Sequence, residues 1–230
     1  MDSKKTTYIV ICILLSTPVF SEIVVFQEYD TTFTLEDDIL TVEKELRLKN
    51  VGSSPIIPGE IHFKVSQQGK DGNIPAQVYD YSVIDRNEED VDTEKIVGKD
   101  ATDLVFTIWE PLLPKFYYDF SMTYKMDFKT KGILFHEIQV PEEQTTIPIK
   151  ESTTSFQLPK SNHITYAPEG DISKTEDYRV IEWDDKSALQ FEYTFLPLPK
   201  TPVRMINIFW VTVILISLIV LVIRFTRSNK

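Results

Sequence analysis

Residues 116–128 read FYYDFSMTYKMDF, and this stretch decides the fold class. Large apolar or aromatic side chains occupy every second position from Phe116 to Phe128, and Tyr117 and polar or charged residues fill the positions between them. A period of two sends alternate side chains to opposite faces, which is the geometry of a β-strand and not of a helix. Such a stripe lines a ligand groove in some proteins, but it more commonly forms the inner face of a β-sandwich. We therefore expect a core strand here.

Similar but shorter segments precede and follow this stretch. Residues 40–48 alternate leucine and valine with threonine, glutamate and arginine, which indicates a strand with one face in water. Further strands are expected at residues 23–33, 61–65, 78–84, 104–109 and 133–140. Short strands separated by turns, without a helical period between them, predict an all-β fold in which the strands form an antiparallel, immunoglobulin-like sandwich.

The sequence PEEQ at residues 141–144 predicts a domain boundary. A second series of strands is expected after it, at residues 145–149, 154–158, 163–167, 178–183 and 188–195. We therefore assign residues 22–140 to the sandwich and residues 141–196 to a smaller, membrane-proximal β unit. The pattern leaves open whether this unit is separate or contributes strands to the first sandwich.

Residues 205–223 read MINIFWVTVILISLIVLVI and contain no charge. As a helix they extend about 28 Å, close to the ~30 Å hydrocarbon core of a bilayer, so we expect one transmembrane helix. Residues 197–204 hold three prolines and predict a short, stiff stalk. Residues 224–230 form the remaining tail.

The N-terminal residues 1–21 combine lysines, a short apolar run and small residues, which predicts a signal peptide that is cleaved after Ser21. The alternative is an uncleaved anchor, although the apolar run at residues 8–15 is much shorter than a spanning helix. Basic residues in the tail favour a cytoplasmic C-terminus. The β units are then extracytoplasmic, either at a cell surface or in the lumen of the endoplasmic reticulum.

Six residues near or within the apolar segment are singled out by chemistry. Aromatic side chains near both ends are expected to act as interface anchors, namely Phe209, Trp210 and Phe225. Polar side chains within the segment are Asn207, Thr212 and Ser217. The polar side chains either bond to their own helix backbone or line a contact with another membrane helix.

Charge and cysteine content exclude several classes of function. The chain has 24 basic and 35 acidic residues; five of the basic ones and one acidic one lie in the signal and tail, which leaves the exported part at about −15. Such a surface repels nucleic acid. The one cysteine, Cys12, lies in the signal, so neither disulfides nor thiol catalysis are expected in the mature chain. The expected partners are the lipid bilayer and other membrane proteins, with no nucleic acid and no small-molecule substrate.

No motif for catalysis or for a cofactor is found. His62, His136 and His163 lack the spacing of a metal site. The acidic run at residues 85–94 begins like an EF-hand loop, but Asp90 takes the position of the invariant glycine. A looser calcium site there is an alternative to a solvated loop. We expect no enzyme, no cofactor and no metal.

The C-terminal third resembles a known layout. The sequence FQLP at residues 156–159, the strand at 178–183 and the sequence FEYTF at 191–195 are followed by the apolar helix. This order resembles the end of the ribophorin I family over about residues 150–225, in a chain much shorter than a full member. The resemblance implies a non-catalytic subunit of the oligosaccharyltransferase. The sequence LRLKNVGSSP at residues 46–55 is similar to the strand and turn of membrane-anchored sandwich domains, including the translocon-associated protein family.

These observations predict a non-enzymatic, single-span accessory or scaffold protein that positions partners at the outer membrane face, in a glycosylation or translocation complex. The alternative is a cell-surface adhesin or envelope structural protein that uses calcium at residues 85–94. An envelope hydrolase is a third reading, which requires a polar cluster at the strand ends.

Overall fold

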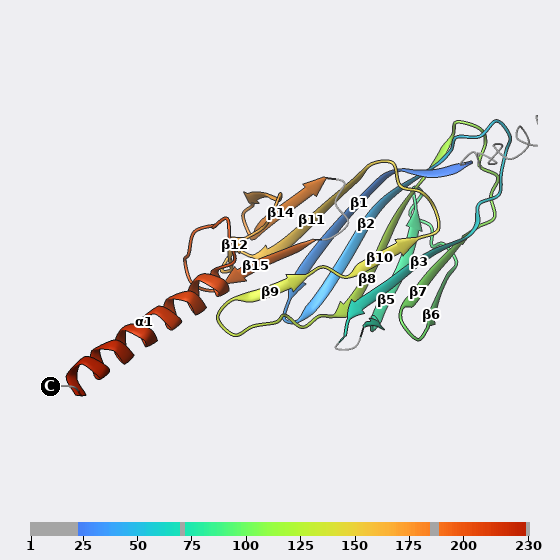
Figure 1. Cartoon of the computed structure of the whole chain (residues 1–230). Helices are drawn as coiled ribbons and strands as arrows, with labels where there is room; N and C mark the ends of the chain where they lie inside the picture. Colours follow the sequence, from blue (N-terminus) through green and yellow to red (C-terminus); the bar gives the residue numbers. More distant parts are fainter. Residues whose placement is uncertain (1–22, 70–71, 185–188, 229–230) are drawn as a thin grey trace, which may run out of the picture.

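The computed structural model describes residues 23–69, 72–184 and 189–228. Its strands form three sheets, and one C-terminal helix, α1 (Met205–Ser228), projects from one end of them (Figure 1). The chain is therefore mostly β with a single apolar helix, as the alternation predicts. The expected signal peptide, residues 1–21, lies outside the described residues.

The largest sheet has seven strands in the order β13-β14-β11-β1-β2-β8-β5. Their bounds are β1 (Val24–Glu36), β2 (Ile39–Asn50), β5 (Val78–Asp85), β8 (Tyr117–Asp127), β11 (Ser152–Pro159), β13 (Asp171–Lys174) and β14 (Tyr178–Asp184). Neighbours are antiparallel except β1 and β11, which run parallel from Tyr29 opposite Ser152 to Thr34 opposite Gln157. The purely antiparallel expectation is wrong for this pair, because β11 joins β1 from far along the chain and a long connection permits parallel pairing.

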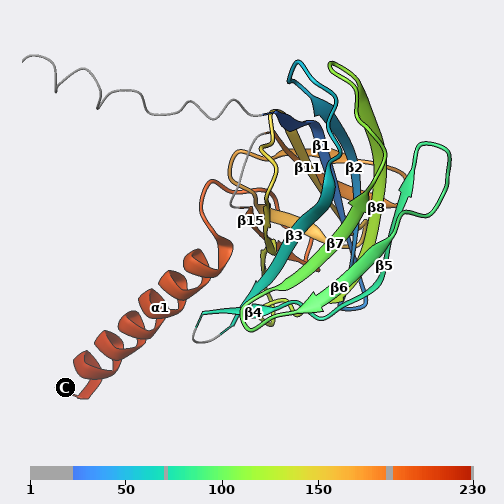
Figure 2. The same ribbon diagram turned by 90° about the vertical axis from the view of Figure 1, so that its right-hand side faces the viewer.

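Two smaller sheets hold the remaining strands. One has the order β10-β3-β7-β6 with β4 also on β3, and the other has the order β12-β15-β9. The bounds of the first are β3 (Gly59–Gln68), β4 (Asn73–Pro75), β6 (Thr93–Val97), β7 (Thr102–Ile108) and β10 (Glu142–Thr145). Those of the second are β9 (His136–Gln139), β12 (His163–Tyr166) and β15 (Gln190–Thr194). Figure 2 shows β3 and β7 in front of the longer β1, β2 and β8.

The chain changes from one small sheet to the other at Pro141, where the boundary is predicted. The strand before it, β9, lies in the three-stranded sheet beside β15. The strand after it, β10, pairs instead with β3 of the five-stranded sheet. Each predicted part therefore lends a strand to a sheet that belongs mainly to the other, and β11 extends the sheet that β1 begins.

The alternating stretch forms β8, and its buried residues confirm the core interpretation. Phe120, Met122, Tyr124 and Met126 are buried and belong to a hydrophobic cluster that draws on all three sheets. Phe116 departs from the pattern, since 62% of its side chain is exposed just before the strand begins.

Aromatic contacts hold the five-stranded sheet against the large one. The ring of Phe63 in β3 lies 5.8 Å from that of Phe26 in β1. The ring of Phe106 in β7 lies 5.4 Å from that of Phe120 in β8. These contacts place the five-stranded sheet over β1, β2 and β8.

The three-stranded sheet covers the other half of the large sheet. The ring of Phe191 in β15 lies 4.7 Å from Phe156 in β11 and 6.0 Å from Trp183 in β14. One layer is thus continuous, and the facing layer is split between two sheets.

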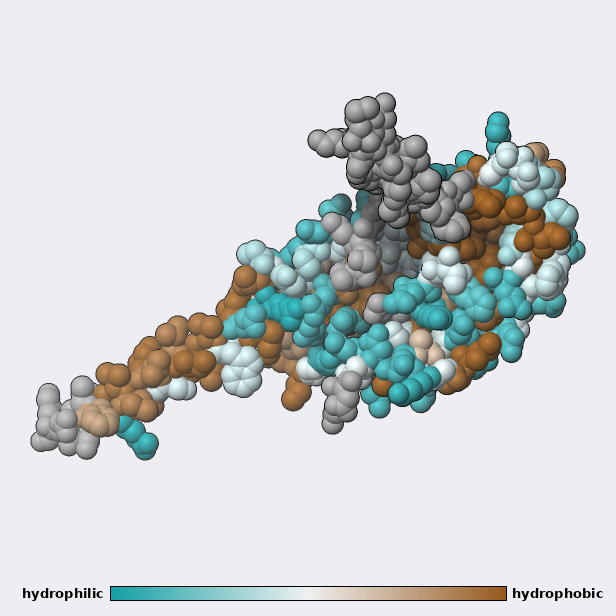
Figure 3. Space-filling model, turned by 45° about the vertical axis from the view of Figure 1, so that its right-hand side comes forward, coloured by the Kyte–Doolittle hydropathy of each residue, from teal (hydrophilic) through white to brown (hydrophobic). Residues whose placement is uncertain are grey.

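Helix α1 leaves the end of the molecule where the three-stranded sheet lies (Figure 1). Its segment Met205–Phe225 is 21 residues long, apolar enough to cross a membrane and not buried against the sheets. The hydrophobic surface covers the helix along its length in Figure 3. The helix extends beyond residue 223, where the sequence predicts the end of the span.

Candidate functional site at the base of the helix

The helix begins without a capping residue of its own. Arg204 precedes it, and no acidic residue lies in its first turn. The first backbone N–H groups of a helix need acceptors, which Ser, Thr, Asp or Asn usually supply from the preceding position. The acceptor must here come from another part of the fold.

Glu192 of β15 supplies that acceptor. Its carboxylate accepts hydrogen bonds from the backbone N–H groups of Met205, at 2.8 Å, and Ile206, at 3.2 Å. The hydroxyl of Thr165 in β12 donates to the same carboxylate at 2.7 Å. Only 1% of Glu192 is exposed, so three donors satisfy a buried charge. A negative charge at a helix N-terminus is also favoured by the helix dipole.

Arg204 adds a second set of contacts directly before the helix. Its guanidinium donates to Oε1 of Glu137 in β9 at 2.9 Å and to Oε1 of Gln190 in β15 at 2.5 Å. It also lies over the ring of Tyr166 in β12, 5.9 Å from the centroid. All three strands of the small sheet therefore contact the residue that directly precedes the apolar helix.

The proline-containing segment at residues 197–204 is bonded to the sandwich. The backbone N–H of Thr201 donates to the carbonyl of Thr165 at 2.7 Å. The ammonium of Lys200 donates to the carbonyl of Gly170 at 3.1 Å. These bonds restrict the stalk that the prolines predict.

We define the junction as Glu192, Thr165, Arg204, Glu137 and Gln190. Its ion pair between Arg204 and Glu137 is about one-third exposed on both sides and contributes little by itself. The buried carboxylate of Glu192 contributes more, because hydrogen bonds to a charged group are stronger and their loss leaves that charge unsatisfied. The junction is suited to fixing the direction of α1 relative to the sheets.

The polar residues predicted in the span bond within their own helix. The hydroxyl of Thr212 donates to the carbonyl of Ile208, and that of Ser217 donates to the carbonyl of Val213, both at 2.8 Å. Asn207 is exposed on the helix surface. These bonds satisfy both hydroxyl protons within the helix itself.

The predicted interface anchors occupy different environments. The ring of Phe209 lies 6.3 Å from Phe135 of the sandwich and 5.7 Å from Trp210. Trp210 and Phe225 are 56% and 68% exposed on the helix. The outer anchor is therefore also a contact between the helix and the sandwich.

The three histidines lie in separate environments. His62 is 3.0 Å from Asp103, the ring of His136 stacks 5.0 Å from Tyr193, and His163 is 3.3 Å from Arg179. Within residues 23–69, 72–184 and 189–228, no group of three or more His, Cys, Asp or Glu side chains could hold a metal.

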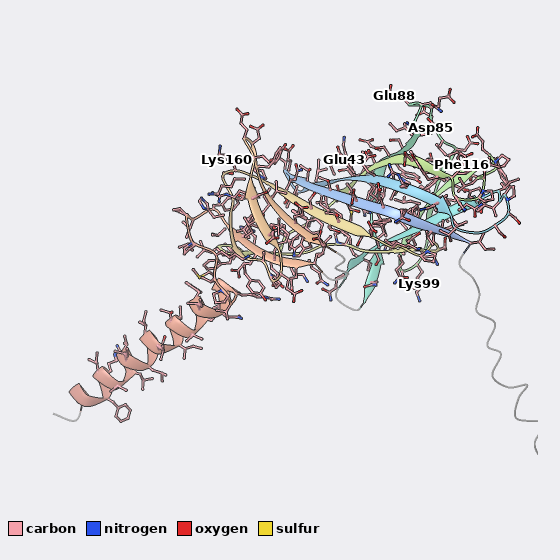
Figure 4. The ribbon with its side chains drawn as sticks, turned by 90° about the horizontal axis from the view of Figure 1, so that it is seen from above. Glu43, Asp85, Glu88, Lys99, Phe116 and Lys160 are labelled. Carbon is pink, nitrogen blue, oxygen red and sulfur yellow. The ribbon has the colours of Figure 1, made fainter. Side chains whose placement is uncertain are left out.

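The acidic loop at residues 85–94 closes on itself. The carboxylate of Asp85 accepts hydrogen bonds from the backbone N–H groups of Asn87 and Glu89, at 2.8 and 2.9 Å. The bonds from Glu89 and Asn87 hold the pKa of Asp85 below its usual value. Figure 4 shows Asp85 and Glu88 on a loop that projects from the sandwich, away from the helix.

A buried ion pair is a further charged feature that the alternation does not predict. Lys44 of β2 is 1% exposed, and its ammonium lies 2.7 Å from Oε2 of Glu143 in β10. The hydroxyls of Thr31 and Tyr29 accept its remaining protons at 2.9 and 3.2 Å. Burial lowers the pKa of Lys44, and Glu143 opposes that shift. The pair lines a pocket of about 440 Å³ and joins the five-stranded sheet to the large sheet.

Exposed apolar residues also gather at the end of the molecule opposite the helix. We define the distal patch as five exposed residues: Ile57, Trp109, Leu113, Phe116 and Tyr117. Backbone hydrogen bonds between Ile56 and Leu112 join the two loops that carry it. Figure 3 shows hydrophobic surface at this end, and Figure 4 places Phe116 there.

Comparisons with known proteins concern the fold more than the activity. No family model matches the chain. An uncharacterized protein of Methanocaldococcus jannaschii is 26% identical over 128 residues, which are 55% of this chain and 90% of that protein. A solved Legionella pneumophila protein, described as a candidate nutrient-binding protein, has a TM-score of 0.50 at 9% identity over 75% of this chain and 67% of its own.

An M1 zinc metallopeptidase of Deinococcus radiodurans has a TM-score of 0.47 at 11% identity, over 76% of this chain and 43% of its own. This chain therefore spans less than half of the peptidase. The comparison with the Legionella protein concerns the fold alone.

Proposed function

We propose that this protein is a single-span, non-enzymatic accessory or scaffold subunit of a membrane complex. Its immunoglobulin-like sandwich is extracytoplasmic, and its C-terminus is cytoplasmic. The observation that carries the proposal is the exposed apolar helix whose first turn is capped by buried Glu192. A scaffold needs a fixed orientation on the membrane, and a tertiary cap at the start of the span provides one.

Lateral contact with other membrane helices is part of this proposal. Asn207, Thr212 and Ser217 are each five residues apart and point in three different directions around the helix axis. Each is therefore a separate polar position at which a neighbouring helix can make contact. The two hydroxyls already bond to the backbone, so contact there requires no new partner for them.

The kind of complex is inferred from the sequence. The resemblance to ribophorin I over residues 150–225 points to a glycosylation complex, and the similarity of residues 46–55 to translocon-associated proteins points to a translocation complex. A non-catalytic role is consistent with the separate environments of the three histidines.

The calcium-dependent adhesin gains no support from the described acidic loop. Asp85 is the first residue of the EF-hand-like run, and its carboxylate already accepts hydrogen bonds from two backbone N–H groups. We therefore advance one function only.

Purification of the full chain from its own cells in mild detergent, followed by mass spectrometry, tests the proposal. We expect defined membrane proteins to co-purify in constant proportion. A matched variant that replaces residues 211–223 with leucines keeps the junction and removes Thr212 and Ser217. Partners that bind the helix through Thr212 or Ser217 are lost from this variant, and partners that bind the sandwich remain. Recovery of the unmodified chain as a lone monomer contradicts the proposal.

A further inference from the structure

Exposed apolar residues surround the base of the helix. We define the collar as five residues from the loop before β9 and from the segment between β15 and α1: Ile133, Leu134, Phe195, Leu196 and Val203. Ile133 is 95% exposed, and Phe195 is 61% exposed. A single exposed isoleucine is common on protein surfaces, but exposed apolar residues that are grouped together indicate a contact surface.

The collar is fixed directly beside α1. The ring of Phe135, next to Leu134, lies 6.3 Å from the ring of Phe209 in the helix. The hydroxyl of Thr194 donates to the carbonyl of Leu134 at 2.7 Å, which joins the loop to the end of β15. The collar therefore cannot move away from the helix without breaking buried contacts.

The turn that presents Ile133 depends on Gly132. Its φ is +115°, and a Cβ at this position would lie 1.9 Å from the carbonyl oxygen of Phe135. A side chain with a Cβ is therefore excluded at this position, and the turn as it stands requires glycine. The exposure of Ile133 follows from a specified turn.

The depth of the collar follows from the length of the helix. The apolar segment Met205–Phe225 has 21 residues and is about 31 Å long, which matches the ~30 Å hydrocarbon core without spare length. Phe209 comes four residues after Met205, about 6 Å along the axis. A loop that contacts Phe209 therefore lies within about 6 Å of the boundary between lipid headgroups and acyl chains, on the acyl side.

We propose that the collar inserts into the outer interfacial layer of the same bilayer that α1 crosses. The collar continues the exposed apolar surface of the helix, and that surface identifies lipid as the occupant. Exposed Lys129 and Lys131 closely precede Ile133 and bring basic charge to this part of an otherwise acidic module. The sandwich then rests on the membrane at two points. This inference rests on the membrane anchorage in the proposed function.

Fluorescence quenching in vesicles tests the insertion with the full chain. Single cysteines on a Cys12→Ser background carry an environment-sensitive dye at Ile133→Cys, at Leu215→Cys in the helix, or at Phe116→Cys in the distal patch. The three positions are 95%, 54% and 62% exposed, so the labels leave the core unchanged. Vesicles of phosphatidylcholine and phosphatidylglycerol contain nitroxide lipids with a shallow or a deep label, and iodide quenches from the water.

We expect the shallow nitroxide to quench the Ile133 dye at least twofold, and the deep nitroxide to quench the Leu215 dye. The Phe116 dye should respond to iodide alone. An Ile133 dye that behaves like the Phe116 dye, with Leu215 still quenched, overturns the collar and leaves the anchor intact. An Ile133 dye shielded from iodide and from both lipids also overturns it, in favour of a protein contact. An unquenched Leu215 dye overturns the anchorage and the collar together.

Discussion

A single buried carboxylate explains how the apolar helix α1 starts. Alternation along β15 places Glu192 on the face opposite Phe191 and Tyr193, which by itself predicts a wet face. The structure buries both faces, because the start of α1 covers the one that carries Glu192. The sequence contains one indirect signal, which is the missing cap before Met205. It cannot identify the acceptor, since 13 residues and a change of direction separate the two groups.

Replacing Glu192 is expected to destabilise the protein through the loss of this cap. Glu192→Ala should lower the free energy of unfolding by about 2–3 kcal/mol, because three buried donors lose their acceptor. Glu192→Gln keeps one acceptor and should cost less. Exposed Glu182→Ala is the matched control and should change stability by about 0.5 kcal/mol or less. Chemical unfolding in detergent measures all three, and equal effects of Glu192→Ala and Glu182→Ala contradict the cap.

The buried ion pair should show strong coupling. Lys44→Met or Glu143→Leu alone leaves one buried charge without its partner and should cost about 3 kcal/mol or more. The double variant removes both charges and should be more stable than either single variant. Chemical unfolding of the four proteins gives the coupling energy. Additive losses would show that the two side chains act independently.

Buried phenols should make the protein sensitive to high pH. Burial, followed by the charge of Glu143, raises the pKa of Tyr29 and of Tyr124 well above the usual value. The folded state keeps these protons, while the unfolded chain releases them above pH of about 10. The unfolded state then binds fewer protons, so stability is unaffected below that pH and falls as pH rises beyond it. Tyrosinate absorbance should show a class of tyrosine side chains that ionises only when the protein unfolds. Ionisation of all tyrosines in the folded protein near the usual pKa of tyrosine contradicts this.

At the scale of elements, long alternating strands were predictable and short exposed ones were not. β8 and β2 follow their pattern because one face of each is in the core. The strands β4, β6 and β13 are missing from the expectation, and β10 lies at residues 142–145, where a boundary is predicted at 141–144 and a strand only from 145. All five residues of β6 are exposed. Such strands form by pairing with a neighbour, which leaves no periodicity to detect. Phe116 shows the opposite error, because it follows the period of two but lies before the start of β8 and is exposed.

Substitutions along β8 should distinguish its two faces. Phe120→Ala removes a buried ring that contacts β7 and should cost about 3 kcal/mol or more. Thr123→Ala on the opposite face should cost about 0.5 kcal/mol. Thermal and chemical unfolding provide the comparison, and similar losses at both positions contradict the assignment of the faces.

At the scale of the whole molecule, two features could not be predicted from the sequence. These are the division of one layer into two sheets and the parallel pairing of β1 with β11. The period of two shows which face of a strand is buried, but it does not show which strand is its neighbour. The pairing of β1 with β11 and the exchange of β9 and β10 between the small sheets are long-range choices, made by packing across the core. The apolar helix was predictable because its length and composition are local properties.

The junction is expected to fix the direction of helix α1 relative to the sandwich. Distances between spin labels at Glu182→Cys in β14 and Leu218→Cys in α1, measured by pulsed electron resonance on the full chain in nanodiscs, test this most directly. A Cys12→Ser background leaves these as the labelled thiols. We expect one narrow distance distribution, which broadens when Glu192→Ala and Arg204→Ala disrupt the junction. A broad distribution with the junction intact would contradict it.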